Sequence, residues 1–429
     1  MSDALPVPPR PNLEHYKKLA KELVKACKSG ECDAIRSWTE QWLEKLVGLQ
    51  VLTPDFRHHL AQQIEKLARN KLLGSGRGRQ CALADAQFVI ARAHGFASWP
   101  KFSKRLEALA RANSLVSKFE AAVDAIVSGD SATLEKLLSE NPQLVRARST
   151  REHRSTLLHY VTANGVEDFR QKTPKNIVEI TKLLLKAGAD VNAESEAYGG
   201  RSTTLGLAAT SWHPENVGVQ LPLMEVLIAH GAIIDGPDLG NAVNGCLHNG
   251  RGEAAEFFAR RGGRLDLEGA AGVGRLDVVK SFFNEDGSLK PNATMAQLKD
   301  GFAWACEYGR TSVVDFLLQK GIEVSGRVKH HGQTGLHWAA CGGHVDTVKL
   351  LLERKAPVDA KDDAWDNTPL GWALHAWGNP PPESKHGRYY EVVALLVAAG
   401  TRVEPEWLAD ENVRADSRMV AALRGEKPG

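Results

Sequence analysis

Residues 333–360, QTGLHWAACGGHVDTVKLLLERKAPVDA, decide the fold. Near their start, the hydroxyl of Thr334 can accept a hydrogen bond from a backbone N–H and so cap a short helix. Gly343 can end that helix, because glycine tolerates the left-handed backbone conformation that follows a helix C-terminus. Val348 and Leu352 then lie four residues apart, as on the apolar face of a second helix. The stretch therefore predicts two short helices joined by a tight turn.

The same unit recurs along the chain. A second copy begins at Thr156 with TLLH and closes at 183–193 with LLLKAGADVNA. Pairs of large apolar residues mark the second helix of each unit, and they lie at 137–138, 184–185, 227–228, 257–258, 282–283, 317–318, 351–352 and 395–396. A period of about 33 residues, with insertions and one shortened unit, accounts for these positions and predicts about eight repeats.

The copies at 156–193 and 333–360 closely resemble the ankyrin repeat, whose signature is T-P-L-H-x-A-A-x-x-G followed by V-x-L-L-L-x-x-G-A-D-V-N-A. The resemblance implies an all-α ankyrin-repeat solenoid in which His159 and His337 hydrogen-bond the hairpins. The third and eighth units carry glycine in place of this histidine. Other repeats are degenerate, because the motif is missing from the fourth to sixth units, which we expect to begin near residues 241, 268 and 301.

The chain of 429 residues is expected to contain four segments. They are a disordered Pro-rich tail at 1–12, a basic helical domain at 13–117, the ankyrin array at 118–404, and a helical cap with its tail at 405–429. A cap is expected because a solenoid needs an atypical unit to cover its end. The net charge of +2 is the sum of two unequal parts. Residues 1–117 carry 19 Lys and Arg against 11 Asp and Glu (+8), and the rest carries 35 against 41 (−6).

Within the basic segment, residues 83–100 read LADAQFVIARAHGFASWP. They resemble an L-A-D-A-Q…G-F-x-S-W-P module that precedes ankyrin arrays in many bacterial proteins. The resemblance suggests a bacterial origin, and it implies no particular chemistry.

Composition excludes several classes of protein. With 43% hydrophobic and 25% charged residues the chain has an ordinary globular composition. No stretch approaches about 18 continuous apolar residues, and the first residues lack a basic segment followed by an apolar one, so we expect neither a membrane span nor a signal peptide. Six cysteines without a pairing pattern do not indicate a disulfide scaffold or a zinc ribbon. We therefore expect a cytoplasmic protein with reduced thiols.

The resemblance also implies where a partner would bind. Ankyrin arrays bind through a concave surface, at positions just before the capping threonine and just before the glycine that ends the first helix. In this sequence we expect the following partner-binding residues: His153, Asn164, Thr210, Ser211, His248, Asn249, Glu307, Tyr308, His330, His331, Gln333, Cys341, Trp365, Asn367 and His375. Aromatic and adaptable polar side chains of this kind are typical of binding surfaces. The aligned Trp304, Trp338 and Trp372 could instead form one column in the core between repeats.

Other functions have weaker signals. His330, His331, His375 and Cys341 could converge on a zinc ion, but no metal-ligand spacing is present, so we expect no metal and no cofactor. Cys341 with a nearby histidine could form a nucleophile pair, and Glu307 with Tyr308 could act as general acid and base. No sequence motif places either pair in a catalytic arrangement. We therefore expect a non-enzymatic scaffold that binds a protein partner. The alternatives are a small-molecule or enzymatic groove beside the 377–389 loop, and nucleic-acid binding by the basic segment.

Overall fold

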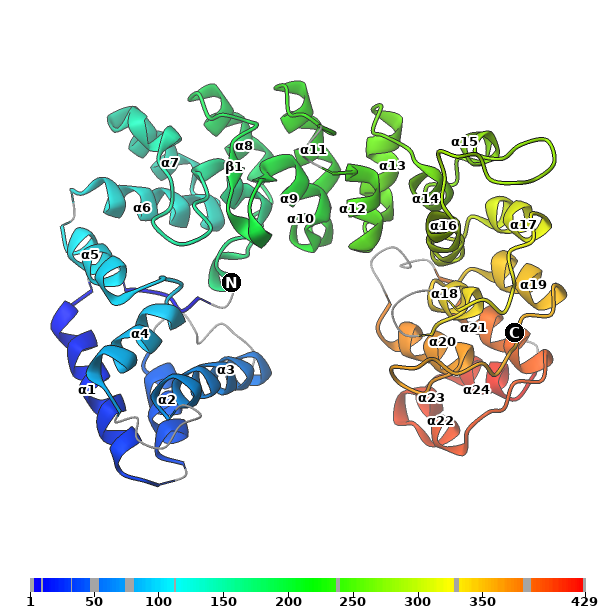
Figure 1. Cartoon of the computed structure of the whole chain (residues 1–429), viewed down its shortest axis with the longest axis horizontal. Coiled ribbons are helices and arrows are strands. Elements are labelled where there is room, and N and C mark those ends of the chain that lie inside the picture. The colour runs from blue at the N-terminus through cyan, green and yellow to red at the C-terminus, as the bar shows by residue number, and fades with distance from the viewer. Residues whose placement is uncertain are drawn as a thin grey trace. The chain divides into compact units, whose positions relative to one another are not determined.

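The structure is a computed structural model that describes residues 4–8, 11–31, 33–46, 54–73, 81–111, 113–236, 240–327, 332–380 and 387–426. These residues are mostly helical, with one short β-hairpin (Figure 1). No helix among them is long and apolar enough to span a membrane. The chain divides into two compact units, unit 1 at 1–233 and unit 2 at 234–429, and the two are described separately.

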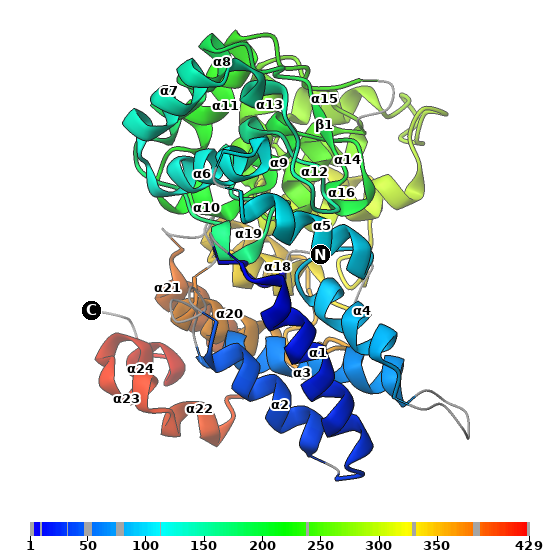
Figure 2. The same ribbon diagram turned by 90° about the vertical axis from the view of Figure 1, so that its left-hand side faces the viewer.

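Unit 1 begins with five helices, α1 (Leu13–Lys28), α2 (Ala34–Glu44), α3 (Pro54–Leu72), α4 (Leu83–Ala93) and α5 (Trp99–Leu109). Helices α1 to α4 pack together around one apolar core (Figure 2). The expectation of a disordered tail at 1–12 is wrong at Ala4 and Leu5, which are buried. The Leu5 N–H donates to the carbonyl of Ala93 at 2.7 Å, and its carbonyl accepts from Nδ1 of His94 at 3.0 Å.

A disulfide joins Cys27 at the end of α1 to Cys81 just before α4, with a Cα–Cα distance of 6.0 Å. The expectation that all thiols are reduced is therefore wrong at this pair. The two cysteines are 54 residues apart in the sequence, so no local sequence pattern predicts that they are in contact. The cytoplasmic location stays a prediction.

Eight helix pairs follow, as the sequence predicts. Three belong to unit 1: α6 (Leu115–Ser128) with α7 (Ser131–Glu140), η3 (Leu157–Thr162) with α8 (Ile177–Lys186), and α9 (Thr204–Thr210) with α11 (Gln220–Ala229). The first helix of the second pair is a 3₁₀ helix. Shorter elements lie between the pairs: η2 (Pro142–Arg146), β1 (Glu194–Ser195), η5 (Ala197–Gly199) and β2 (Ser202–Thr203). Two others lie between the helices of one pair: η4 (Asp168–Arg170) in the second pair and α10 (Trp212–Asn216) in the third. Strands β1 and β2 pair antiparallel, with Glu194 opposite Thr203.

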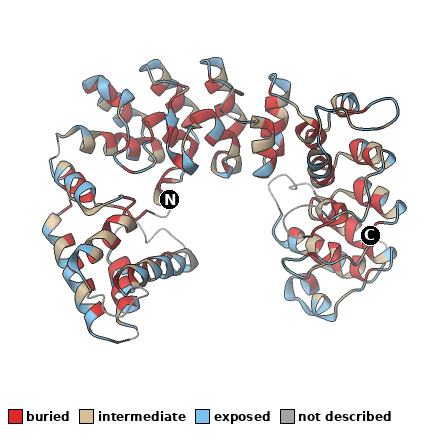
Figure 3. Cartoon of the chain, viewed as in Figure 1, coloured by how far each residue is buried: buried red, intermediate tan, exposed pale blue. Residues whose placement is uncertain are grey.

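Unit 2 contains the other five pairs. They are α12 (Ala242–His248) with α13 (Gly252–Arg260), α14 (Leu267–Gly272) with α15 (Leu276–Ser281), α16 (Met295–Glu307) with α17 (Thr311–Gln319), α18 (Gly335–Cys341) with α19 (Val345–Glu353), and α20 (Pro369–Gly378) with α21 (Tyr389–Ala398). The expected cap follows as three short helices, α22 (Pro405–Ala409), α23 (Glu411–Ala415) and α24 (Ser417–Leu423). Buried residues lie where neighbouring helices face one another (Figure 3).

The motif histidines link neighbouring repeats, as the resemblance implies. Nδ1 of His337 accepts from the backbone N–H of Thr334 at 3.1 Å, and Nε2 donates to the carbonyl of Asn367 in the next hairpin at 3.2 Å. His159 makes the equivalent bonds to Thr156 and Ser202. Burial lowers the pKa of His159 to about 4, so the ring stays neutral and can accept at one nitrogen while donating at the other.

The degenerate units keep the same cap chemistry with other residues. Asn241 caps α12, Asp266 caps α14 and Thr294 caps α16, each through its side-chain oxygen. Helix α16 begins at Met295, six positions before the expected residue 301. The sequence signature is lost in these units because several oxygen-bearing side chains can serve as N-caps.

Buried charges join the helices of the basic segment to the first repeats within unit 1. Arg105 of α5 pairs with Glu120 of α6 at 2.5 Å, and Arg170 reaches the same carboxylate at 2.7 Å. Arg151 of the first hairpin donates to the carbonyl of His94 at 2.5 Å. The expected boundary at residue 117 is thus bridged by these contacts, and the division of the chain lies further on, inside the repeats.

Candidate functional site

A row of three tryptophans lies on unit 2. Trp338 comes from α18, Trp372 from α20, and Trp365 from the hairpin that precedes α20. Ring centroids are 5.2 Å apart for Trp338 and Trp372, and 5.7 Å apart for Trp365 and Trp372, both in the edge-to-face geometry that aromatic pairs prefer. Trp365 is 65% exposed, whereas Trp338 and Trp372 are half-buried. The tryptophans therefore align between repeats at the margin of the core rather than inside it.

The hairpin that carries Trp365 is organised by one carboxylate. Oδ1 of Asp362 accepts from the backbone N–H groups of Ala364 at 2.9 Å and Trp365 at 2.8 Å. Oδ2 accepts from the N–H of Asn367 at 3.2 Å and from the indole Nε1 of Trp372 at 3.0 Å. Burial alone would raise the pKa of Asp362, but these hydrogen bonds to the charged form outweigh it and lower the pKa. The exposed indole of Trp365 is therefore held on an ordered turn.

His375 extends this surface, because it lies one helical turn after Trp372 on α20 and is exposed. We call Trp338, Trp365, Trp372 and His375 the aromatic face. It presents large, rigid side chains, which are the residues that contribute most to protein interfaces.

A second contact on unit 2 joins helices two repeats apart. The rings of His248 on α12 and Trp304 on α16 meet edge-to-face with centroids 4.5 Å apart. Nε2 of His248 lies 3.3 Å from a carboxylate oxygen of Glu268 on the intervening α14. Burial raises the pKa of Glu268, with a further contribution from nearby acidic side chains and an opposing one from His248.

Glycines on α14 permit this close approach. A Cβ on Gly272 would lie 2.5 Å from Cδ1 of Leu247, and a Cβ on Gly269 would lie 2.5 Å from Oδ1 of Asn244. Helix α14 therefore packs tightly on α12, and residues of α16 can reach across it.

The structure distributes the expected partner-binding residues over three environments. Four are exposed: His248, Asn249, Trp365 and His375. Six are half-buried: His153, Asn164, Thr210, Glu307, Cys341 and Asn367. His330 and His331 lie outside the described residues. The remaining three, Ser211, Tyr308 and Gln333, are buried, contrary to expectation.

Tyr308, Ser211 and Gln333 are buried, so none of them is available to a partner. The ring of Tyr308 packs where a Cβ on Gly252 would stand, and its hydroxyl donates to the carbonyl of Leu247 at 2.8 Å. Gly252 permits this burial, because a side chain there would occupy the space of the Tyr308 ring. Ser211 and Gln333 are each 2% exposed.

His153 turns inward instead of toward a partner. Its Nδ1 lies 2.8 Å from the hydroxyl of Ser155, and its Nε2 lies 3.7 Å from a carboxylate oxygen of the buried Glu167. Asn164 of the second unit and Thr210 of the third, both expected to contact a partner, are hydrogen-bonded to each other. Nδ2 of Asn164 donates to Oγ1 of Thr210 at 3.2 Å.

Sequence reasoning missed Tyr198, which is 73% exposed. Its hydroxyl donates to Oδ1 of Asn164 at 2.6 Å. Tyr198 stands just before Gly199 and Gly200, and this glycine pair was the available signal for a tight hairpin tip.

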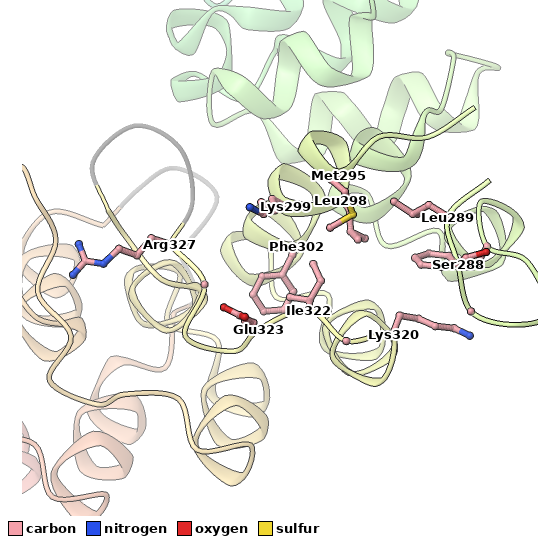
Figure 4. Close-up of a pocket in the computed structure, with 14 residues that line it drawn as sticks. Ser288, Leu289, Met295, Leu298, Lys299, Phe302, Lys320, Ile322, Glu323 and Arg327 are labelled. Atoms are coloured by element: carbon pink, nitrogen blue, oxygen red, sulfur yellow. The ribbon is translucent and has the colours of Figure 1, made fainter. Parts of the chain in front are cut away.

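A cavity of about 570 Å³ opens between hairpins of unit 2 (Figure 4). Its lining is mixed: the apolar residues are Phe283, Leu289, Met295, Leu298, Phe302 and Ile322, and the charged ones are Lys299, Lys320, Glu323 and Arg327. Met295 is 59% exposed at its edge. Arg327 points away from the other lining side chains in Figure 4, and its guanidinium pairs with Asp363 at 2.6 Å. This ion pair connects one lining residue, Arg327, to the hairpin that carries Trp365.

The described residues offer little support for catalysis. None of their His, Cys, Asp and Glu side chains form a group of three or more that could hold a metal ion. Burial raises the pKa of the Cys246 and Cys306 thiols well above the usual range, so both stay protonated and are poor nucleophiles.

Comparisons with known proteins agree with the repeat architecture. The family model for ankyrin repeats (3 copies) matches residues 267–362 and 302–406. The E3 ubiquitin-protein ligase hecd-1 of Caenorhabditis elegans is 43% identical over 60 residues, which are 14% of this chain and 2% of that protein. The SMC5-SMC6 complex localization factor protein 1 of Bos taurus is 34% identical over 122 residues, 28% of this chain and 10% of that protein.

A longer match covers 243 residues of the probable E3 ubiquitin-protein ligase XBOS32 of Oryza sativa subsp. japonica, at 29% identity, with 56% of this chain and 38% of that protein. The chain thus spans well under two thirds of these relatives. The crystal structure of the human ASB11 ankyrin repeat domain superposes with a TM-score of 0.32 at 20% identity, covering 66% of this chain and 99% of that one.

Proposed function

Residues 267–406 of this chain are ankyrin repeats, which are generally protein–protein interaction modules, and we propose that the chain is a non-enzymatic scaffold that binds a protein partner on the aromatic face of unit 2. The observation that carries this proposal is the exposure of Trp365 on an ordered turn. Trp365 is not exposed singly, because it packs on Trp372 beside Trp338, and tryptophan is among the residues that most often dominate interface energetics.

The order of the turn supports the proposal independently of the exposure. A partner that binds Trp365 pays little conformational entropy, because Asp362 already fixes the backbone around it. The Trp372 ring packs edge-to-face against the Trp365 indole, and His375 offers a polar side chain one turn further along α20. A flat aromatic surface with a polar margin fits a folded partner or a peptide that lays apolar side chains across it.

The neighbouring cavity supports an extended contact. Its apolar residues and its volume suit one or two large apolar side chains of the same partner. The ion pair between Arg327 and Asp363 connects the edge of the cavity to the Trp365 hairpin. We therefore propose that the partner surface runs from the aromatic face to this cavity.

The test compares two exposed tryptophans in the intact protein. A partner is first identified by crosslinking in cells that express the chain, and its affinity for purified wild-type protein is measured. Trp365→Ala is expected to weaken binding at least about tenfold. Trp212→Ala is the matched control, because Trp212 is 49% exposed and lies on α10 of unit 1. Equal affinities for wild type, W365A and a W365A/H375A double variant would remove the aromatic face as the site.

A further inference from the structure

A cleft of about 490 Å³ lies in unit 1, between α5 and the tip of the hairpin at 150–154. Helix α5 contributes Lys101, Lys104, Arg105 and Ala108, whose spacing of three, four and seven residues places them on one helical face. The hairpin tip contributes two further arginines, Arg151 and Arg154. Five cationic side chains therefore line one cleft. This cleft is separate from the aromatic face of unit 2.

The two buried cations of the cleft are already neutralised. Arg105 pairs with Glu120 at 2.5 Å, and Arg151 forms an ion pair with Glu167. These pairs are parts of the network that joins the N-terminal helices to the first repeats. They give the cleft a fixed wall, but they leave no net charge for a ligand.

The exposed cations are different. Among the described residues, Lys101, Lys104 and Arg154 take part in no ion pair, and Glu152, the carboxylate that lines the cleft, is engaged by Arg92. Three uncompensated positive charges thus face one cleft. Like charges gathered in this way repel one another unless an anion is bound between them.

The backbone at Arg154 adds a second observation. Its φ is 52°, in the left-handed region where glycine is favoured over residues with a Cβ. A glycine here would relieve the backbone while keeping the turn, yet the position carries a guanidinium that reaches the cleft. Strained non-glycine residues of this kind are concentrated at ligand-binding sites.

The rest of the lining is suited to an organic group. Ala108 and Val116 are half-buried and supply apolar surface, and the buried Phe96 ring behind them lies 5.6 Å from the Arg151 guanidinium, measured to the ring centroid. Lys101 stands in the first turn of α5, and Ser98 at the N-cap makes no side-chain hydrogen bond to the helix.

We propose that this cleft binds a small organic phosphate, with Lys101, Lys104 and Arg154 contacting the phosphate oxygens and Ala108 and Val116 contacting the organic part. A phosphate group carries up to two negative charges and accepts from ammonium and guanidinium donors in several directions. The volume of the cleft matches that of small-ligand sites. This site is in unit 1, so it is independent of the partner surface on unit 2.

The experiment measures binding of ADP and of inorganic pyrophosphate to the full-length chain by titration calorimetry. Wild type is expected to bind ADP with one site per chain. Arg154→Gly is expected to weaken the affinity at least about tenfold while keeping the fold, because glycine suits the positive φ. A K101Q/K104Q double variant is expected to act in the same direction. The matched control is K182Q/K186Q, which removes two exposed lysines from α8 and should leave the affinity within about twofold.

Three further ligands separate this proposal from its competitors. They are a phosphoserine peptide, the same peptide without phosphate, and a single-stranded oligonucleotide of about 12 nucleotides, a length that single-strand binding sites commonly span. ADP affinity that falls in R154G and K101Q/K104Q but not in K182Q/K186Q supports the organic-phosphate site. Binding of the phosphopeptide alone or of the oligonucleotide alone would overturn it in favour of those ligands. Absence of ADP binding, or equal affinity in R154G with an unchanged circular dichroism spectrum, would also overturn it.

Discussion

The indole Nε1 of Trp372 donates a hydrogen bond of 3.0 Å to Oδ2 of Asp362, ten residues earlier in the chain. This contact ties helix α20 to the hairpin that precedes it, and the same carboxylate holds the backbone under Trp365. One buried acidic residue thus connects the helix, the hairpin and the exposed tryptophan.

Asp362→Ala is expected to lower the free energy of unfolding by about 1–3 kcal/mol, because several buried N–H donors lose their acceptor. Chemical denaturation monitored by circular dichroism would measure this change. The control is Asp366→Asn, since Asp366 is exposed and pairs with Lys361 at the surface, and asparagine tolerates the left-handed backbone at this position (φ 50°) as aspartate does. The expected effect of the control is within about 0.5 kcal/mol. Equal effects of both substitutions would show that Asp362 does not organise the hairpin.

Substituting alanine for each of two glycines in neighbouring helices should change the stability of the protein in opposite directions. Gly272→Ala places a Cβ 2.5 Å from the buried Leu247 side chain, so we expect a loss of about 1–3 kcal/mol from overpacking. Gly245 on α12 has no heavy atom of the described residues within 4 Å of such a Cβ. Gly245→Ala is therefore expected to stabilise the protein by up to about 1 kcal/mol through helix propensity. Thermal unfolding of both variants decides the point, and the same sign for both would contradict the close packing of α14.

Asn367 replaces the missing histidine of the eighth repeat. Its Oδ1 accepts from the N–H of Thr368 at 3.0 Å, the task of the His337 ring in the seventh repeat, and a Cβ on Gly371 would lie 1.8 Å from that oxygen. Gly371→His alone should therefore destabilise the protein by about 1–3 kcal/mol. In the double variant N367A/G371H the ring has room to accept from Thr368, and we expect at least half of that loss to be recovered. Additive effects in a double-mutant cycle would show that the two residues are not alternatives.

Acid is expected to weaken unit 1 through its buried charges. Burial alone would raise the pKa of Glu120, but Arg170 and Arg105 lower it to about 2 from its ordinary value of 4.5. A carboxyl group with a lowered pKa in the folded state stabilises the protein above its unfolded pKa and loses that contribution as the pH falls toward the folded value. The melting temperature should therefore fall between about pH 4.5 and pH 2.

Glu120→Gln provides the check for this pH dependence. The variant is expected to melt earlier than wild type at pH 7, because Arg105 and Arg170 lose their charged partner, and to show a smaller fall between pH 4.5 and the folded pKa of about 2. Parallel melting curves for wild type and E120Q over this range would mean that the Glu120 pairs do not contribute.

Local sequence signals predicted the repeats because each repeat is defined by neighbours in the chain. The cap at Thr334, the turn at Gly343 (φ 68°) and the apolar face of α19 all arise within about one repeat length, so their spacing predicts the helix pair. The exposure of Trp365 was predicted for the same reason, since it follows from its place on a hairpin tip. Where Asn241, Asp266 and Thr294 replace the motif, the same physics operates with a less recognisable signature.

The sequence by itself determined that this chain forms helix pairs, how many there are and where a cap closes them. Only the tertiary structure decided which candidate side chains reach solvent. Tyr308 is buried because its ring packs against Gly252 and its hydroxyl donates to the Leu247 carbonyl, and the disulfide of Cys27 and Cys81 closes over 54 residues. The cleft beside Lys101 likewise depends on a hairpin about fifty residues later in the chain. Such contacts join residues that are far apart in the sequence and are not related by the repeat spacing. They can be predicted only when the packing between elements is known.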